Sequence, residues 1–461
     1  MAPLLNMVIT ECTTHLPPDA RVIIAVSGGP DSQCLLDLLA RARSATTIHT
    51  IIAAGIDHGL RPEASQELDF AEQLANSHHI PFERVAVEVP KKGNRMAQAR
   101  AARYEALRSL AERHGAHFIA TGHTATDQAE TVLFNLARGA GPRGVSGMAP
   151  TQNDLFRPLL AATRDQTLRY ALQNHLPHAT DPTNEDTAYS RPLLRHEVLP
   201  RLQQLNPCSE NNINHFARLI REDDHFITQL AQEELHRATS LVGSLHLAPL
   251  HTLPGPVLSR VLLLWLARHA LPQDRALLHT LQGLITGKET AWKQSVGPGT
   301  TLEITQGNLW CDRPHPGYHF TLSCPGDLTI PALPGALKAR PLPGHKMRHM
   351  LNKSAFNHPW EVAFGLKQLH PERQGFTVRT WQTGDRIQSF GATGHTTLGD
   401  LFTNARIPRP LRRLWPLVEW QGELVWVPGL RRGAGLPVTS SSEATAWLQW
   451  TGGLWPLKND E

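Results

Sequence analysis

The chain has 461 residues, of which 41% are hydrophobic and 19% are charged, and its formal net charge is +4. These proportions are typical of a soluble globular protein, and the length predicts two to four domains at about 150 residues each. No apolar run approaches the about 18 residues that a membrane span needs, and the N-terminus lacks a signal-peptide pattern. The small positive charge permits a polyanionic partner without requiring one.

Strand and helix patterns alternate over the first 140 residues. Strands are predicted over residues 21–26, 48–57, 82–89 and 117–121, and helices over residues 32–43, 62–79, 94–114 and 124–138. This alternation predicts an α/β fold whose parallel sheet is covered by helices on both faces. In such sheets, ligands bind outside the carboxyl ends of the strands.

A turn rich in small residues follows the first strand. It consists of Ser27, Gly28, Gly29, Pro30, Asp31 and Ser32. We expect its two glycines to let the backbone approach a ligand closely and to adopt φ values that other residues resist. The free amides and the dipole of the next helix can hold phosphate, the serine hydroxyls add donors, and Asp31 would need Mg²⁺ beside a phosphate. An ordinary tight turn is the alternative interpretation.

Polar residues also follow the second and fourth strands. Asp57 ends the second strand, where it could contact adenosine or, alternatively, cap a turn. Gly122 and His123 follow the fourth strand. Three polar sites at one sheet edge predict a ligand site there more strongly than any single motif.

Two carboxylates lie at the start of the helix after the fourth strand. Asp127 and Glu130 are three residues apart, so both project from one side of that helix. Such a pair can hold Mg²⁺ or an ammonium group. A solvated acidic first turn that suits the helix dipole is the alternative.

Arginines supply further candidates for the site. Arg100 and Arg103 share one face of their predicted helix, and Arg195 lies in a polar stretch before a later helix. Arginine suits phosphate and carboxylate recognition, although such arginines are more often simply solvated.

Beyond residue 150 the pattern changes in stages. Regular periodicity weakens over residues 150–207, which predicts irregular structure closing over the site. Helical spacing then dominates, short extended runs broken by Pro and Gly follow, and a last unit ends the chain. The predicted domains are residues 1–205, 206–290, 291–365 and 370–461.

Several motifs occur together in a fixed order along residues 20–205. They read SGGPDS, DHGLR, NR…ARAARY, TGHTATDQAET, RGAGPRGVSGM, RPLL, DPTN and R…RHEVLP. In this set the chain resembles the bacterial tRNA(Ile)-lysidine synthetases, a family of PP-loop ATP pyrophosphatases. The tail, with RTWQTGDRI and VWVPG, is similar to the C-terminal domain of that family. Thr396 and Thr397 stand where the family often has paired lysines, and Pro192 stands where it usually has Asn.

The resemblance implies a ligase that joins L-lysine to C2 of the wobble cytidine of tRNA(Ile) with anticodon CAU, after ATP adenylates the base. By this resemblance the four predicted domains are, in order, a PP-loop ATP-binding catalytic domain, a helical tRNA-contacting domain, a small β-rich unit and a C-terminal tRNA-binding domain. ATP and Mg²⁺ are the implied cofactors, and lysine and tRNA are the implied partners.

The motif match also assigns candidate roles. ATP would be bound by Ser27, Gly28, Gly29, Pro30, Asp31, Ser32, Asp57 and Gly122. Asp31 and Asp127 would hold the metal. The candidate catalytic residues are Asp31, Asp127, Glu130, Arg100, His123 and Arg195.

The C-terminal unit carries charges suited to tRNA. Its arginines are Arg406, Arg409, Arg412, Arg413, Arg431 and Arg432. Trp415 and Trp420 are predicted to be exposed aromatics, whereas Trp426 between two valines is predicted to be core.

The cysteines bear on location and on a rival activity. All five lack a C-x-x-C spacing, which predicts neither a disulfide framework nor a zinc or iron–sulfur site and favours a reducing cytoplasm. The alternatives are a PP-loop tRNA thiolase, which needs suitable cysteines, a small-molecule amide ligase, and a non-enzymatic tRNA-binding module. The oligomeric state is open, and a homodimer is compatible with the sequence.

Overall fold

The structure is a computed structural model of the chain. It describes residues 2–57, 59, 63–88, 95–179, 190–331, 333–342, 360–366, 375–439, 442 and 444–453. Two compact units make up the chain: an N-terminal unit, Met1–Phe226, and a C-terminal unit, Ile227–Glu461. The four-domain division stays a prediction.

The N-terminal unit alternates strands and helices. Its elements are α1 (Ala2–His15), β1 (Ala20–Val26), α2 (Pro30–Ala42), η1 (Arg43–Ala45), β2 (Ile48–Asp57), α3 (Glu63–Ser77), β3 (Phe82–Ala86), α4 (Arg95–His114), β4 (Phe118–Thr121), α5 (Ala125–Ala137), α6 (Pro142–Val145), β5 (Thr151–Gln152), β6 (Leu155–Phe156), α7 (Arg164–Gln173), α8 (Ser190–Leu193), η3 (Leu194–Val198), α9 (Leu199–Leu205) and the start of α10 (Ser209–Ala238). The expectation of irregular structure over residues 150–207 was wrong for the helices α7 to α9.

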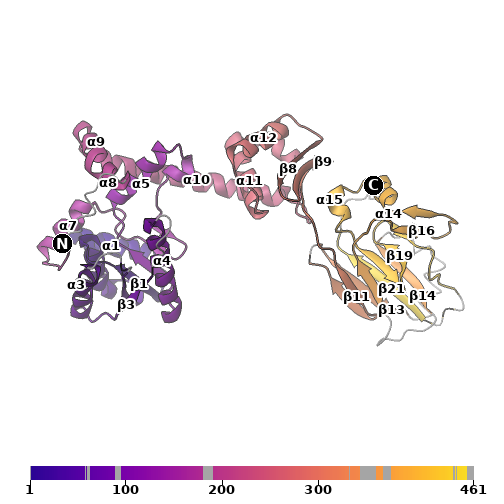
Figure 1. The fold of residues 1–461 in the computed structure, drawn as a ribbon, viewed down its shortest axis with the longest axis horizontal. Helices are drawn as coiled ribbons and strands as arrows, with labels where there is room; N and C mark the ends of the chain where they lie inside the picture. Colours follow the sequence, from indigo (N-terminus) through magenta and orange to yellow (C-terminus); the bar gives the residue numbers. More distant parts are fainter. Residues whose placement is uncertain are drawn as a thin grey trace. The chain divides into compact units, whose positions relative to one another are not determined.

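A six-stranded sheet in the order β3-β2-β1-β4-β6-β5 forms the centre of this unit. All neighbours pair in parallel except β5, which is antiparallel to β6. Val22 and Ile24 of β1 pack into one core with residues of α1, α2, α3 and α7, whereas Ile23 and Ala25 pack into a second core with α4. The predicted α/β fold with a doubly covered parallel sheet is confirmed (Figure 1).

The strand order places two loops beside each other. The chain runs outward from β1 through β2 to β3 and then returns to place β4 on the other side of β1. At such a switch point, the loops that leave the two central strands diverge and open a crevice for a ligand. These are the loops that follow Val26 and Thr121.

The C-terminal unit begins within α10 and is rich in strands. Its other elements are β7 (Leu245–His246), η4 (Ala248–Thr252), α11 (Gly255–Arg268), α12 (Arg275–Thr286), β8 (Trp292–Gly297), β9 (Thr300–Thr305), β10 (Asn308–Asp312), β11 (His319–Leu322), β12 (Gly326–Thr329), β13 (Ala336–Pro341), β14 (Glu361–Leu366), β15 (Phe376–Arg379), β16 (Arg386–Gln388), β17 (His395–Thr397), α14 (Leu398–Asn404), α15 (Arg409–Arg412), β18 (Leu417–Trp420), β19 (Glu423–Val427), β20 (Arg431–Arg432) and β21 (Ala444–Thr451). In the described part of the chain, no helix has both the length and the apolar character needed to cross a membrane.

Four sheets occur among these strands. They have the orders β7-β10-β9-β8, β11-β15-β18-β19-β20, β12-β13-β21-β14 and β16-β17. Strand β21 pairs with both β13 and β14, so the end of the chain completes a sheet begun more than 100 residues earlier. Trp415, Trp420 and Trp426 all lie in the core of this unit. The prediction that Trp415 and Trp420 are exposed was therefore wrong, and that of a buried Trp426 is confirmed.

Candidate active site

The turn between β1 and α2 is tight, and its first glycine is required by packing rather than by an unusual φ angle. Gly29 is the N-cap of α2 with φ −76° and ψ 155°, and neither glycine of the turn has a positive φ. A Cβ on Gly28 would lie 2.4 Å from Glu67 Cβ. Gly28 is therefore required by close packing against α3, and the expectation of unusual φ values was wrong.

Ser32 fixes the shape of this turn. Its side chain is buried, and its hydroxyl lies 2.6 Å from Ser27 O and 2.9 Å from Gly29 O while accepting from Ser27 N at 3.1 Å. The first amide of α2 that bonds back is that of Gln33, to Gly29 O at 3.2 Å. The amides of Asp31 and Ser32 precede it, so helix geometry gives them no partner within α2. Pro30, at the first position, has no amide to satisfy.

Asp31 connects the turn to a helix far along the sequence. Its carboxylate accepts a hydrogen bond from the Thr167 hydroxyl and lies 3.7 Å from Arg164 Nη1, both on α7. Burial raises the pKa of Asp31, and the charge of Arg164 and the hydrogen bond from Thr167 partly oppose that rise. The charges of Asp127 and Arg195 also act on the pKa of Asp31, so these two residues lie within electrostatic reach of the turn.

Gly122 lets the two loops approach. A Cβ at this position would lie 3.3 Å from Asp31 C and O and from Ser32 N. Such a contact is tighter than ordinary van der Waals packing, so any larger side chain would crowd the first turn of α2.

Asp127 caps the start of helix α5 and also forms an ion pair with Arg195. Its Oδ2 accepts from Thr124 N at 2.8 Å and from the Thr124 hydroxyl at 2.9 Å, completing a capping box at the start of α5. Its Oδ1 lies 3.4 Å from Arg195 Nη2. Asp127 therefore caps α5 and contacts Arg195, and at 18% exposure it is not the solvated carboxylate of the alternative interpretation.

Glu130 is the least satisfied group of the cluster. It is 1% exposed, and its Oε1 accepts from Arg195 Nε at 2.6 Å. Its Oε2 is buried without a hydrogen-bond partner among the described residues. Burial raises the pKa of Glu130, although Arg195 opposes the rise. A buried carboxylate with an unused acceptor is costly to keep, which marks it as a candidate functional group.

Arg195 bridges the two carboxylates from an unusual backbone. It lies on η3, a π-helical turn of residues Leu194–Val198. Short π-helical segments occur frequently at functional sites, and the one here aims the guanidinium at both Asp127 and Glu130.

His123 is neutral at physiological pH. Its Nδ1 lies 2.8 Å from the Thr121 hydroxyl, and burial lowers the pKa of its imidazole to about 4. It can therefore form hydrogen bonds at the site but does not supply positive charge. The charges of Arg157 and Arg100 act on this pKa, which places both arginines near it. Arg100 is exposed and stacks over the Tyr104 ring at 5.2 Å.

Asp57 does not join this cluster through any contact that the structure describes. Its Oδ1 accepts from Gly59 N at 2.9 Å, so the carboxylate caps the turn after β2. His58 and Arg61 of the DHGLR motif, and the DPTN motif, lie outside the described residues.

Sequence reasoning missed Arg164 and Thr167, because α7 was not predicted. One local signal was available. Thr163 and Gln166 form a capping box, a pattern that marks the start of a helix.

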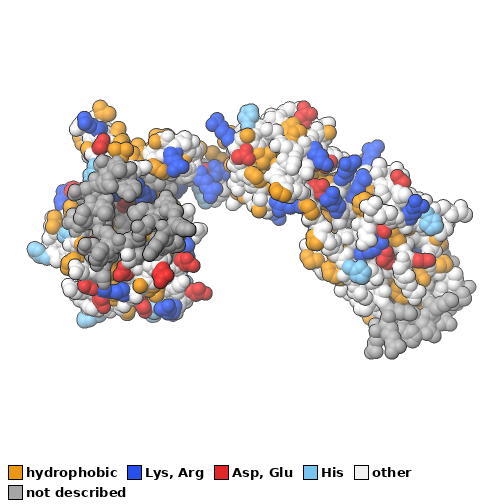
Figure 2. Space-filling model, in the orientation of Figure 1, with side chains coloured by type: hydrophobic (Ala, Val, Ile, Leu, Met, Phe, Trp, Pro, Cys, Tyr) orange, Lys and Arg blue, Asp and Glu red, His pale blue; other side chains and the backbone are white. Residues whose placement is uncertain are grey.

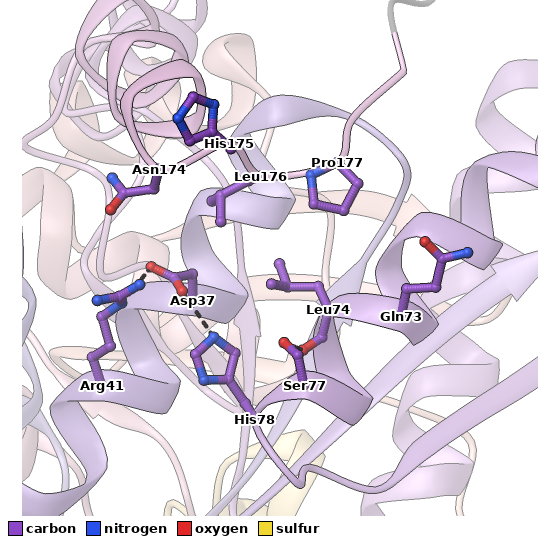
Figure 3. A pocket seen from close by; sticks show the side chains of 10 residues that line it. All are labelled: Asp37, Arg41, Gln73, Leu74, Ser77, His78, Asn174, His175, Leu176 and Pro177. Carbon is purple, nitrogen blue, oxygen red and sulfur yellow. Dashed lines mark hydrogen bonds and ion pairs between the residues drawn. The ribbon is translucent and has the colours of Figure 1, made fainter.

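A separate polar cavity of about 350 Å³ lies farther along α2 (Figure 3). In it, the Asp37 carboxylate accepts from Arg41 Nε at 2.7 Å and from Tyr170 Oη at 2.6 Å, and it lies 2.8 Å from His78 Nε2. Asp37 is thus saturated by groups of α2 and α7 and one just after α3, and none of the predicted site residues line this cavity.

The arginines of the C-terminal unit fall into two groups. Arg409 and Arg413 are exposed at α15, where Figure 2 shows Lys and Arg side chains gathered. Arg432 is half-buried, with its guanidinium 4.1 Å from the Phe390 ring and bonded to the carbonyls of Gly433, Ala363 and Leu436. The contacts of Arg432 are those of a structural residue.

The cysteines lie apart from any reactive cluster. Cys34, on α2, is buried, and burial raises the pKa of its thiol. Cys208 is exposed, and no cysteine is disulfide-bonded. Among the described residues, no group of three or more His, Cys, Asp or Glu side chains is arranged to hold a metal ion.

Comparisons with known proteins identify relatives that cover 90–93% of the chain. Residues 4–202 match the PP-loop domain family, and residues 376–450 match the TilS substrate C-terminal domain family. The chain is 31% identical to the tRNA(Ile)-lysidine synthase of Geobacillus kaustophilus, covering 91% of this chain and 92% of the relative. It is also 31% identical to that of Symbiobacterium thermophilum, over 93% and 94%, and 28% identical to that of Bacillus subtilis, over 90% of each.

Proposed function

Because the chain belongs to the tRNA(Ile)-lysidine synthase family, we propose that it joins the ε-amine of L-lysine to C2 of the wobble cytidine in the isoleucine tRNA with anticodon CAU. It is a tRNA-modifying ligase that uses ATP. The structural observation that carries the proposal is the convergence, at one sheet edge, of the first turn of α2 with the Asp127, Glu130 and Arg195 cluster.

The reaction has two steps that this site suits. The C2 oxygen of cytosine attacks the α-phosphate of ATP, and pyrophosphate leaves. The lysine amine then attacks C2, loses a proton, and AMP departs with the former C2 oxygen. Both steps need positioned phosphates and neutralised charge.

The phosphates would bind at the free amides of Asp31 and Ser32, at the positive end of the 13-residue helix α2. Arg195 and Arg100 would neutralise charge near them. His123, which is neutral, would contribute a hydrogen bond rather than charge.

The acidic pair would receive the lysine ammonium. Glu130 Oε2 is buried without a described partner and offers an acceptor that Arg195 does not use. The raised pKa of Glu130 makes its carboxylate a stronger base, which suits it to take the proton lost by the attacking amine.

Asp31 and Asp127 would hold a nucleotide-bound Mg²⁺. The absence of a three-ligand cluster in the described part of the chain does not conflict with this, because Mg²⁺ beside a nucleotide uses one or two carboxylates together with phosphate oxygens. When bound, the ion would neutralise phosphate charge next to the two carboxylates.

The C-terminal unit would hold the tRNA through phosphate contacts, with Arg409 and Arg413 among its exposed candidates. Unpaired cysteines and a tRNA substrate favour the cytoplasm. The thiolase alternative is not favoured, since Cys34, the cysteine closest in sequence to the turn, is buried and inert.

The test is release of AMP from ATP by the full chain, with lysine and the tRNA each omitted in turn. AMP release only with tRNA, and a tRNA product heavier by lysine less one water, would support the proposal. Exchange of oxygen for sulfur would indicate a thiolase, and turnover without tRNA would indicate a small-molecule ligase. Either result would overturn the proposal.

A further inference from the structure

Helix α7 directs two side chains at the carboxylate of Asp31. Thr167 is fully buried and donates its hydroxyl hydrogen to Asp31 Oδ1, while Arg164 Nη1 lies 3.7 Å from Oδ2. The residues are three apart and share one face of the helix. Both oxygens of Asp31 are thus held by one element.

Thr167 and Arg164 differ in how many hydrogen-bond donors they leave free for a ligand. The Thr167 hydroxyl has a single hydrogen, and both Asp31 Oδ1 and Arg164 O, the latter 2.9 Å away, are placed to accept it. The side chain of Arg164 is 31% exposed, and its ion pair with Asp31 is the only side-chain bond it makes among the described residues. A guanidinium has five N–H donors, so most of those on Arg164 remain available to an anion.

The start of α7 is fixed against the helix that carries the acidic pair. Arg164 N donates to the Thr126 hydroxyl at 3.1 Å, and that hydroxyl donates to Glu210 Oε1 at 2.8 Å. Ala125 N also donates to Ala162 O at 2.7 Å. A rigid support of this kind keeps the side chains of α7 in register with the site.

We propose that Arg164 is a further ligand for the nucleotide phosphates and that Thr167 is a positioning residue that orients Asp31. A phosphate at the first turn of α2 would meet the negative charge of Asp31. Arg164 offsets that charge and adds donors suited to phosphate oxygens. This inference rests on the proposed function only in taking ATP as the nucleotide.

The test compares substitutions on α7 in the full chain. Arg164→Gln is expected to raise the Kd for MgATP, measured by calorimetry, by about 10- to 100-fold, as loss of a charged hydrogen bond predicts. Arg164→Lys should recover part of this. Arg169→Gln is the matched control, since Arg169 lies on the same helix, pairs with Asp165 and is 65% exposed. It should leave the Kd unchanged.

Thr167→Val keeps the size of the side chain and removes the hydroxyl. We expect a fall of about tenfold or more in turnover, with the Kd for MgATP within about threefold, because a misaligned carboxylate affects the reaction more than binding. Thr167→Ser should restore turnover. Circular dichroism and melting temperatures of each variant identify any that fail to fold.

The outcomes separate this inference from the proposed function. If the unaltered chain binds ATP and modifies tRNA while Arg164→Gln binds ATP equally well, the inference for Arg164 is wrong and the proposed function stands. If Thr167→Val and Thr167→Ser have equal turnover, the role of Thr167 is overturned. If the unaltered chain binds ATP but never modifies tRNA, the function fails, and the Kd comparison still decides the role of Arg164.

Discussion

Each unit of the molecule holds an arginine between two carboxylates. The two clusters differ in how completely their carboxylates are hydrogen-bonded. In the C-terminal unit, Arg379 donates to both oxygens of Asp385 at 2.8 Å and to Glu419 Oε1 from Nε at 2.9 Å. In the N-terminal unit, Arg195 reaches Glu130 at 2.6 Å and Asp127 at 3.4 Å.

The difference lies in what remains unbonded. Asp385 also accepts from Gln382 N at 2.8 Å, and although burial opposes it, bonding to Arg379 lowers the pKa of Asp385. Burial dominates at Glu130 instead and raises its pKa, with Oε2 left without a described partner. A saturated cluster stabilises the loop around it, whereas an unsaturated one retains capacity for a ligand. The same residue types therefore indicate structure in one unit and a site in the other.

Glu130→Gln is the variant with the largest expected effect, and it tests whether the Arg195 cluster is a functional site. It keeps the shape of the side chain and removes its charge, and we expect turnover to fall by about 10³-fold or more. Stability should be unchanged or higher, because the raised pKa of Glu130 reports an unfavourable buried charge. AMP release and thermal melting measure both, and Glu222→Gln, an exposed glutamate of the same unit, is the control. Activity within tenfold of normal would contradict the assignment.

Arg379→Met tests the structural cluster. It leaves two largely buried carboxylates without their partner, and we expect a loss of about 3–5 kcal/mol in the free energy of unfolding. Urea titration followed by tryptophan fluorescence suits this unit, whose Trp415 and Trp426 are buried. Arg237→Met, which removes the ion pairs of an arginine whose side chain is 66% exposed, should cost less than about 1 kcal/mol. Similar losses in the two variants would remove the distinction drawn for Arg379.

The two clusters should also respond to pH with opposite sign. The folded-state pKa of Asp385 is lowered, so its contribution to stability is present above the unfolded value of about 3.9 and is lost as pH falls through the folded pKa. The folded-state pKa of Glu130 is raised, so its contribution is present below the unfolded value of about 4.3 and is lost as pH rises through the folded pKa.

Urea titrations over pH 3 to 7, an interval of about four units around those reference values, measure these slopes. Asp385→Asn should remove the loss of stability that occurs as pH falls. Glu130→Gln should remove the loss of stability that occurs as pH rises. The slope of one ionising group is at most about 1.4 kcal/mol per pH unit. Slopes of the same sign for both groups would mean that one of the two assignments is reversed.

The smallest effect is expected at α15. Replacing Arg412 and Arg413 by Ala should weaken tRNA binding a few-fold and reduce the salt dependence of the binding constant by the equivalent of up to about two phosphate contacts. Arg412 also bonds to Ile407 O at 2.8 Å, so melting temperatures must accompany the binding curves. Removing Arg113 and Arg169, both exposed in the N-terminal unit, controls for net charge. An unchanged salt slope would remove α15 from the tRNA-binding surface.

The parts of the site that the sequence could predict are those set by local chemistry. The turn after β1, Gly122 after β4, and the shared side of Asp127 and Glu130 all follow from short-range patterns. The contact between Asp31 and Thr167 joins residues 136 apart in sequence and depends on tertiary packing that no local pattern encodes. The π-helical turn beneath Arg195 likewise leaves no recognisable periodicity.

The same limit explains the errors at Trp415 and Gly28. An aromatic near several arginines suggests a surface, but Trp415 donates its indole N–H to Pro428 O at 3.0 Å and is fully buried. A glycine pair in a turn suggests unusual dihedral angles, whereas at Gly28 the constraint is the neighbouring helix α3. In both positions the deciding partner is distant in sequence.

The distribution of thiols has a practical consequence for spectroscopy. Cys12, Cys34 and Cys324 are buried and Cys311 is half-buried, and burial raises the pKa of each. Cys208 is exposed and immediately precedes the 30-residue helix α10. A maleimide dye should therefore attach selectively at this one position in the unaltered chain, giving a single-site fluorescent label without any engineered cysteine.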